Sequence, residues 1–144
     1  MAASTLIALA DSIVASLNAG AFSLPFEVQR GYRPAVGLPD LAAVMVTVIP
    51  KSLAITAATR ADGFYDCAID VGVQRQVNAA DPAELDALMS LVEEIGDHLR
   101  SRPLDGFPAA VWLSLENEPV FAPEHLEKEH VFTSVLTVTY RVRR

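Results

Sequence analysis

Several features that would point to a familiar chemistry are scarce in this sequence. Only one of its 144 residues is a cysteine, Cys67, so the chain forms no internal disulfide and supplies no four-cysteine zinc site. Basic residues are also in deficit, with 11 Lys and Arg against 18 Asp and Glu and a formal net charge of −7. Because nucleic acids and anionic membranes attract clustered Lys and Arg, this balance argues against non-specific binding to either.

Long apolar runs and common catalytic motifs are missing as well. No stretch approaches the roughly 20 unbroken apolar residues of a membrane-spanning helix. Residues 2–17 are rich in apolar side chains, but they lack a basic leading region and are interrupted by Asp11, so they do not predict a secretory signal. The sequence contains no phosphate-binding glycine loop, nucleophile elbow or HExxH motif. We therefore expect a soluble intracellular protein, with no membrane partner, that is not an enzyme.

Two segments have the apolar spacing of amphipathic helices. In residues 6–17 apolar side chains recur at every third or fourth position, and the pattern ends near Gly20. The second segment opens with Asp81, Pro82 and Glu84, which fit an N-cap, a proline in the first turn and a carboxylate three residues after the cap. Its apolar stripe continues to Leu99, so both segments are predicted to be helices.

The remaining segments alternate between apolar and polar residues, which is typical of strands with one buried face. Pro25 places the first strand at a sheet edge or delays its start, Pro50 is expected to close the second, and the turn residues 61–63 predict a hairpin. The expected extended segments are 22–32, 41–49, 53–60, 65–77, 109–115 and 132–144. The order predicts one domain, residues 1–144, with an α+β fold in two layers, in which both helices cover one face of a mostly antiparallel sheet.

Side chains that could perform chemistry are better explained as structural. His125 and His130 lie in an acidic segment but are five residues apart, which does not stack them on one helix face, so we expect a solvated loop and no metal site. Asp66 and Asp70 fall on one face of a strand about 13 Å apart, too far for a carboxylate pair, and are expected to face solvent. Cys67 falls on the apolar face and is predicted to be a buried, inert thiol.

Two further interpretations concern single groups of residues. His98, beside Asp97 in the second helix, is expected at the boundary between that helix and solvent. The terminal Arg141, Arg143 and Arg144 form the one basic cluster, and pairing with an acidic neighbouring subunit is the favoured use. No catalytic, cofactor-binding or metal-binding residue is therefore predicted.

The whole arrangement resembles the tail terminator and tail completion proteins of long-tailed bacteriophages. The resemblance rests on the helix of residues 6–17, Arg30-Gly31-Tyr32, the strand of residues 46–50, the strand YDCAIDVGVQR, the capped helix from Pro82 and the closing strand TSVLTVTYRVRR. It implies a structural virion protein that caps the tail tube as a homo-oligomeric ring, commonly a hexamer, and is contacted by the head-side neck or connector. It also implies assembly in the host cytoplasm, DNA passing through the lumen without specific binding, no cofactor and no catalysis.

The resemblance directs attention to two groups of residues. The subunit interface or lumen is expected at Thr137, Thr139, Arg141 and Arg143. A loop that docks onto another ring, the tail tube in particular, is expected at Glu118, Glu124, Glu127 and Glu129. Two alternatives stay open: another neck protein such as a head-tail stopper or adaptor, and a small α+β module that binds a protein or a ligand.

Overall fold

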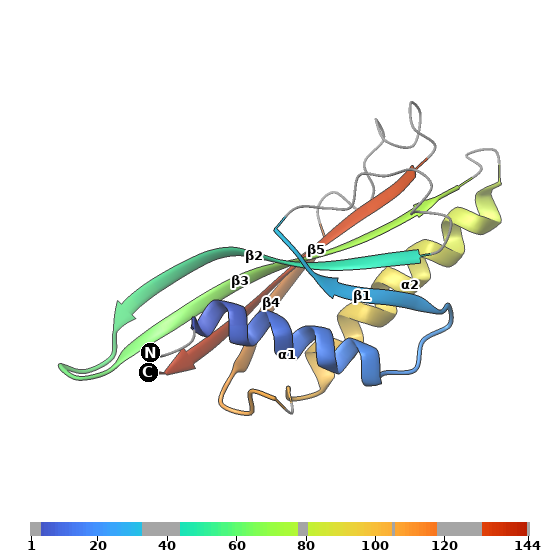
Figure 1. Ribbon diagram of the computed structural model, residues 1–144. Helices are drawn as coiled ribbons and strands as arrows, with labels where there is room; N and C mark the ends of the chain where they lie inside the picture. The colour runs from blue at the N-terminus through green and yellow to red at the C-terminus, as the bar shows by residue number, and fades with distance from the viewer. Residues whose placement is uncertain (1–3, 33–43, 78–80, 105, 118–130, 144) are drawn as a thin grey trace.

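The computed structural model describes residues 4–32, 44–77, 81–104, 106–117 and 131–143 (Figure 1). Along the chain, these residues form helix α1 (Thr5–Ala19), strands β1 (Phe26–Arg30), β2 (Val44–Ala57) and β3 (Gly63–Gln76), helix α2 (Pro82–Ser101), and strands β4 (Val111–Asn117) and β5 (Val131–Arg143). The strands join in one sheet in the order β1-β2-β3-β5-β4. β1 pairs with β2 in parallel and every other pair is antiparallel, which confirms the predicted α+β class.

Both helices begin at the capping residues that the sequence supplies. The Asp81 side chain accepts a hydrogen bond from the Ala83 backbone N–H at 3.1 Å, and Pro82 occupies the first turn, as predicted. In α1 the Ser4 hydroxyl accepts from the Ile7 N–H at 3.4 Å. Each cap satisfies a backbone donor that has no partner within the helix. Neither helix is long and apolar enough to cross a membrane, as far as the described residues go.

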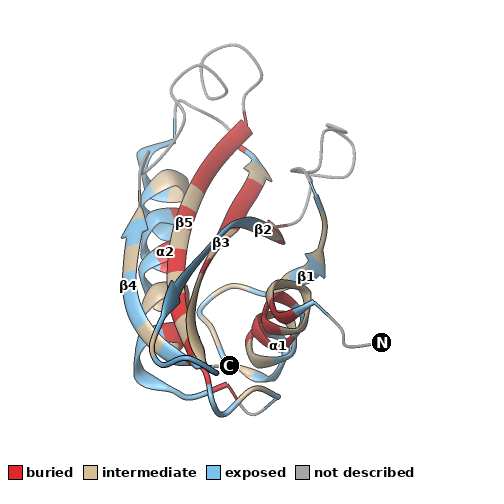
Figure 2. Cartoon of the chain, turned by 90° about the vertical axis from the view of Figure 1, so that its left-hand side faces the viewer, coloured by how far each residue is buried: buried red, intermediate tan, exposed pale blue. Residues whose placement is uncertain are grey.

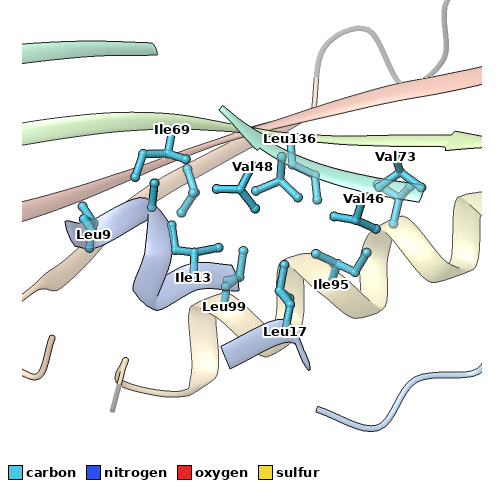
Figure 3. Close-up of a cluster of buried hydrophobic side chains, with 14 of the residues drawn as sticks. Leu9, Ile13, Leu17, Val46, Val48, Ile69, Val73, Ile95, Leu99 and Leu136 are labelled. Atoms are coloured by element: carbon cyan, nitrogen blue, oxygen red, sulfur yellow. The ribbon is translucent and has the colours of Figure 1, made fainter. Parts of the chain in front are cut away.

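The core lies between the helices and one face of the sheet. Figure 3 shows Leu9, Ile13 and Leu17 of α1 meeting side chains of β2, β3 and α2, and most of these residues are fully buried. α1 packs on β1 and β2, whereas α2 packs on β4 and β5. On β5, Tyr140 is buried with its hydroxyl donating to the Leu99 carbonyl at 3.4 Å, and burial raises the pKa of that phenol to about 12. Two amphipathic helices thus cover one face, as expected.

Strand β2 departs from the prediction at Pro50. The sequence favoured a strand that closes there and a separate extended segment at residues 53–60, but β2 runs on to Ala57 and pairs with β3 throughout. The register shifts between Pro50 and Ser52, which is where a residue without an N–H is tolerated in a ladder. The expectation of closure was therefore wrong, because an irregularity absorbs the proline.

The other strand bounds shift by a few residues. β1 begins at Phe26, just after Pro25, and lies at the sheet edge, in agreement with the proline signal. β4 starts at Val111 rather than residue 109. The hairpin predicted from the turn residues 61–63 joins β2 to β3.

Candidate functional site

The four residues expected at an interface or lumen share one face of the sheet. Thr137, Thr139, Arg141 and Arg143 alternate along β5 with the core residues, so their side chains lie on the face away from the helices, which we call the open face. Thr137, Thr139 and Arg141 are half-buried and Arg143 is exposed. The sequence therefore placed all four together correctly, although not their partners.

Arg141 pairs with an aspartate of its own chain. Its guanidinium donates two hydrogen bonds to the Asp66 carboxylate, from Nε to Oδ1 at 2.7 Å and from Nη2 to Oδ2 at 3.0 Å. The two residues are directly opposite each other on β3 and β5, and the guanidinium also lies over the Phe64 ring, 5.0 Å from its centroid. Hydrogen bonding from Arg141 holds the pKa of Asp66 below its usual value.

Similar contacts lie on both sides of this pair along the open face. Arg143 Nη2 donates to Asp62 Oδ2 at 3.3 Å, and the Thr137 hydroxyl donates to Asp70 Oδ1 at 2.7 Å. Lys51 lies 3.9 Å from the same Asp70 oxygen. Asp66 and Asp70 are therefore not simply solvent-facing, and the arginines at positions 141 and 143 find their acidic partners within the chain instead of depending on a neighbouring subunit.

At its other end the open face is buried. Thr47, Gln74 and Thr133 all lie on this face and are at most 7% exposed. The Gln74 amide donates to the Thr133 hydroxyl at 3.4 Å, while Thr47 Oγ1 and Gln74 Oε1 have no hydrogen-bond partner in the described part of the chain. The accessible part of the open face is consequently the part that carries the Asp–Arg contacts.

Beyond the helices, β2 and β3 extend together as a projecting hairpin, residues 51–65, which we call the arm (Figure 1). Residues 51–57 are all exposed. Two of them are large and apolar: Leu53 is 43% exposed and Ile55 is 58% exposed. They are opposite Cys67 and Tyr65, so they lie on the helix-bearing side of the sheet, and Figure 1 shows this end of the hairpin extending past the start of α1. Figure 2 shows this part of β2 in pale blue in front of the buried strands.

A groove of about 400 Å³ lies between α2 and the edge strand β4. Its apolar wall is formed by Val92, Trp112, Leu115 and Leu136, and Glu93, Asp97 and Arg100 of α2 add charged groups. Gly96 deepens the groove, because a Cβ at this position would stand 3.6 Å from Leu115 Cδ2. No expectation from the sequence included this groove. The available signal was a glycine inside an otherwise regular helix, together with a tryptophan in the strand that follows.

The residues weighed for chemistry have structural roles. Cys67 is fully buried, which confirms the predicted burial, and burial raises the pKa of its thiol. His98 does not simply mark the solvent boundary: its Nε2 is 3.0 Å from Ser16 Oγ and 3.1 Å from the Ser16 carbonyl oxygen, and its ring meets Phe22 edge-on. Partial burial lowers the pKa of His98. It links α2 to α1.

Among the described residues no group of three or more His, Cys, Asp or Glu side chains is placed to hold a metal ion. His125, His130 and the four glutamates expected to dock onto another ring lie outside the described residues. No protein-family model and no curated protein matches this sequence. The arm, the open face and the groove are thus the features from which a function has to be argued.

Proposed function

We propose that this protein is a structural subunit of a phage virion that assembles as a ring on the end of the tail tube and joins it to the head-side neck. The observation that carries the proposal is the arm. A hairpin that leaves its own helices and exposes Leu53 and Ile55 gains nothing for a monomer, since those side chains would be more stable when covered. Another subunit that packs on the arm would bury these side chains. The resemblance of the sequence to tail terminator proteins indicates that the assembly is a ring.

The open face is consistent with a wall that DNA passes. Arg141 and Arg143 are neutralised by Asp66 and Asp62, and Lys51 lies close to Asp70. With a chain of net charge −7, such a face offers phosphates no uncompensated cationic row. DNA would therefore slide past it without specific binding.

To test this proposal, we would measure the native mass of the protein by light scattering. The measurement would cover a range of concentrations, with and without polymerised tail-tube protein. We expect a closed oligomer of defined mass, alone or bound to tube ends seen by electron microscopy. Binding to the connector instead of the tube would favour a stopper or adaptor. A monomer that ignores both would contradict the proposal.

A second candidate, a binding module for a small molecule or peptide, is favoured by the groove between α2 and β4. Its volume of about 400 Å³ falls within the usual range of ligand sites, and its wall is largely apolar with a few charged groups. Thermal-shift screening of the monomeric fraction tests it: a ligand that raises the Tm and shifts NMR signals of Val92 and Leu115 would favour this module over the ring.

A further inference from the structure

Several strand edges of the sheet have no neighbouring strand among the described residues, including the outer edge of β1, and two others bear on assembly. β1 pairs with β2 only over residues 44–48, so from residue 52 to residue 57 the outer edge of β2 has no neighbouring strand. β4 is the last strand on the opposite side of the sheet, and its outer edge is free over the 7 residues of that strand. Such edges present a row of backbone donors and acceptors that another strand can use.

The free edge of β2 is not protected against pairing. Its sequence, Ser-Leu-Ala-Ile-Thr-Ala, contains no charge and no proline, and both devices stop just before it, at Pro50 and Lys51. Leu53 and Ile55 alternate along this edge on the side of the sheet that carries the helices. An added strand with this pattern would present two apolar side chains to whatever lies beneath it.

The topology makes the two edges compatible. β2 and β5 are both antiparallel to β3, so they run in the same direction, and β4 runs opposite to them. When a second copy is moved sideways to the β4 edge, its β2 is therefore antiparallel to β4 and its helices lie on the same side. The two edges are different surfaces, so the contact runs head to tail and leaves one of each free for the next copy.

The groove lies where such a strand would place its side chains. A strand added beside β4 with its helix-side residues facing α2 directs Leu53 and Ile55 toward Val92, Leu115 and Leu136. Lys51, whose Nζ lies 3.9 Å from Asp70 Oδ1 on the open face, stays on the other side of the sheet from the groove in this arrangement.

We propose that the arm of one copy adds as a strand to the free edge of β4 in a second copy, with Leu53 and Ile55 filling the groove between α2 and β4. This contact rests on the proposed ring and gives it its subunit interface. It leaves the Asp–Arg contacts of the open face intact within each copy. The successive copies share one continuous sheet, which closes into a ring when the rotation at each contact allows it.

The first test replaces Ile55 and a matched neighbour. Thr56 is exposed on the same arm but faces the opposite side, toward the row of Phe64. We expect Ile55→Lys to weaken self-association by about 30-fold or more, as for a hot-spot residue, and Thr56→Lys to change it little. Sedimentation velocity over a concentration series measures both, and circular dichroism checks that each variant is folded.

The second test blocks the groove and then mixes two defective proteins. Gly96→Leu fills the groove, whereas Gly96→Ala adds only a Cβ at ordinary contact distance from Leu115 and serves as the control. Ile55→Lys and Gly96→Leu should each be monomeric alone. Mixed, they should form a one-to-one dimer and nothing larger, since one copy has an intact groove and the other an intact arm.

Other outcomes separate the interface from the ring. If the unmodified protein forms a ring and Ile55→Lys does so equally well, the arm contact is wrong and the proposed function stands. If neither single variant assembles and the mixture stays monomeric, the head-to-tail contact is overturned. If the unmodified protein is monomeric at every concentration and does not assemble on tail tubes, both proposals fail. The free edges would then be available to a strand of a different protein.

Discussion

The hairpin of β2 and β3 has two halves with the same sequence pattern and opposite environments. In the half under the helices, Val46, Val48 and Ile69 are fully buried. In the arm, Leu53 and Ile55 lie on the same face, because the register shift between Pro50 and Ser52 moves the alternation from even to odd positions, yet about half of each side chain is exposed. Alternation therefore specifies which face of a strand is apolar. Whether anything covers that face depends on where the helices end.

The largest expected effect contrasts two isoleucines on that face. Ile69→Ala should lower the free energy of unfolding by about 2–5 kcal/mol, because it leaves a cavity in the core. Ile55→Ala in the monomer should cost less than about 1 kcal/mol, since the side chain is 58% exposed. Urea denaturation at low protein concentration measures both. Equal costs would mean that the arm is covered within a single chain.

Local sequence signals were sufficient to predict most of the helices and strands that form the buried core. The cap at Asp81, the helical spacing up to Leu99 and the alternation along β5 are local signals, and the structure confirms the elements they predicted. Pro50 was misread because a proline's effect on a strand depends on its partner: only the register of β3 shows that an irregularity absorbs it.

The site was less accessible to sequence analysis. The alternation correctly grouped Thr137, Thr139, Arg141 and Arg143 on one face, but their pairing with Asp62, Asp66 and Asp70 depends on strand register, which a single strand does not encode. The groove beside Gly96 and the length of the arm depend on how far α2 and α1 extend over the sheet. Those are tertiary properties, and no periodic pattern signals them.

The next effect concerns the ion pair that fastens the arm to the sheet, since no helix in the described part of the chain covers the arm. The Asp66–Arg141 pair joins β3 to β5 at the base of the arm. Asp66→Asn should speed amide hydrogen exchange in residues 51–66 and leave exchange around Ile69 and Val71 unchanged. Arg141→Lys, which keeps the charge but loses the bidentate geometry, should have an intermediate effect. Equal acceleration in both halves would show that the hairpin opens as one unit.

The same pair predicts a pH dependence with a definite sign. The pKa of Asp66 is lower in the folded protein than its ordinary value of 3.8, so the folded state favours the ionised carboxylate. Its stabilising contribution is fully present above about pH 4 and is lost as the pH falls through the lower folded pKa. Thermal unfolding between pH 6 and about pH 2 should therefore show a smaller acid-side decrease in Tm for Asp66→Asn than for the unmodified protein. Parallel curves would contradict this assignment.

A smaller effect is expected at the boundary between the halves. Pro50→Ala should destabilise the protein by about 0.4–1 kcal/mol, because the unfolded chain gains conformational freedom that proline denies it. Since the effect acts on the unfolded state, it should appear in global unfolding and leave hydrogen exchange in the arm relative to the core unchanged. If exchange in the arm rises selectively, the proline is needed to keep the register shift between Pro50 and Ser52.

The smallest effect sharpens the comparison most. Leu53 and Ile55 are both replaced with threonine. Threonine is favoured in strands, but it removes apolar area from the arm. In the monomer the free energy of unfolding should change by less than about 0.5 kcal/mol, as for most substitutions at exposed positions. Self-association should nevertheless weaken, because the threonines fill the groove of a second copy less well. A variant that loses assembly at unchanged stability would assign the exposed apolar face of the arm to contact between molecules, whereas a large loss of stability would place it within the fold.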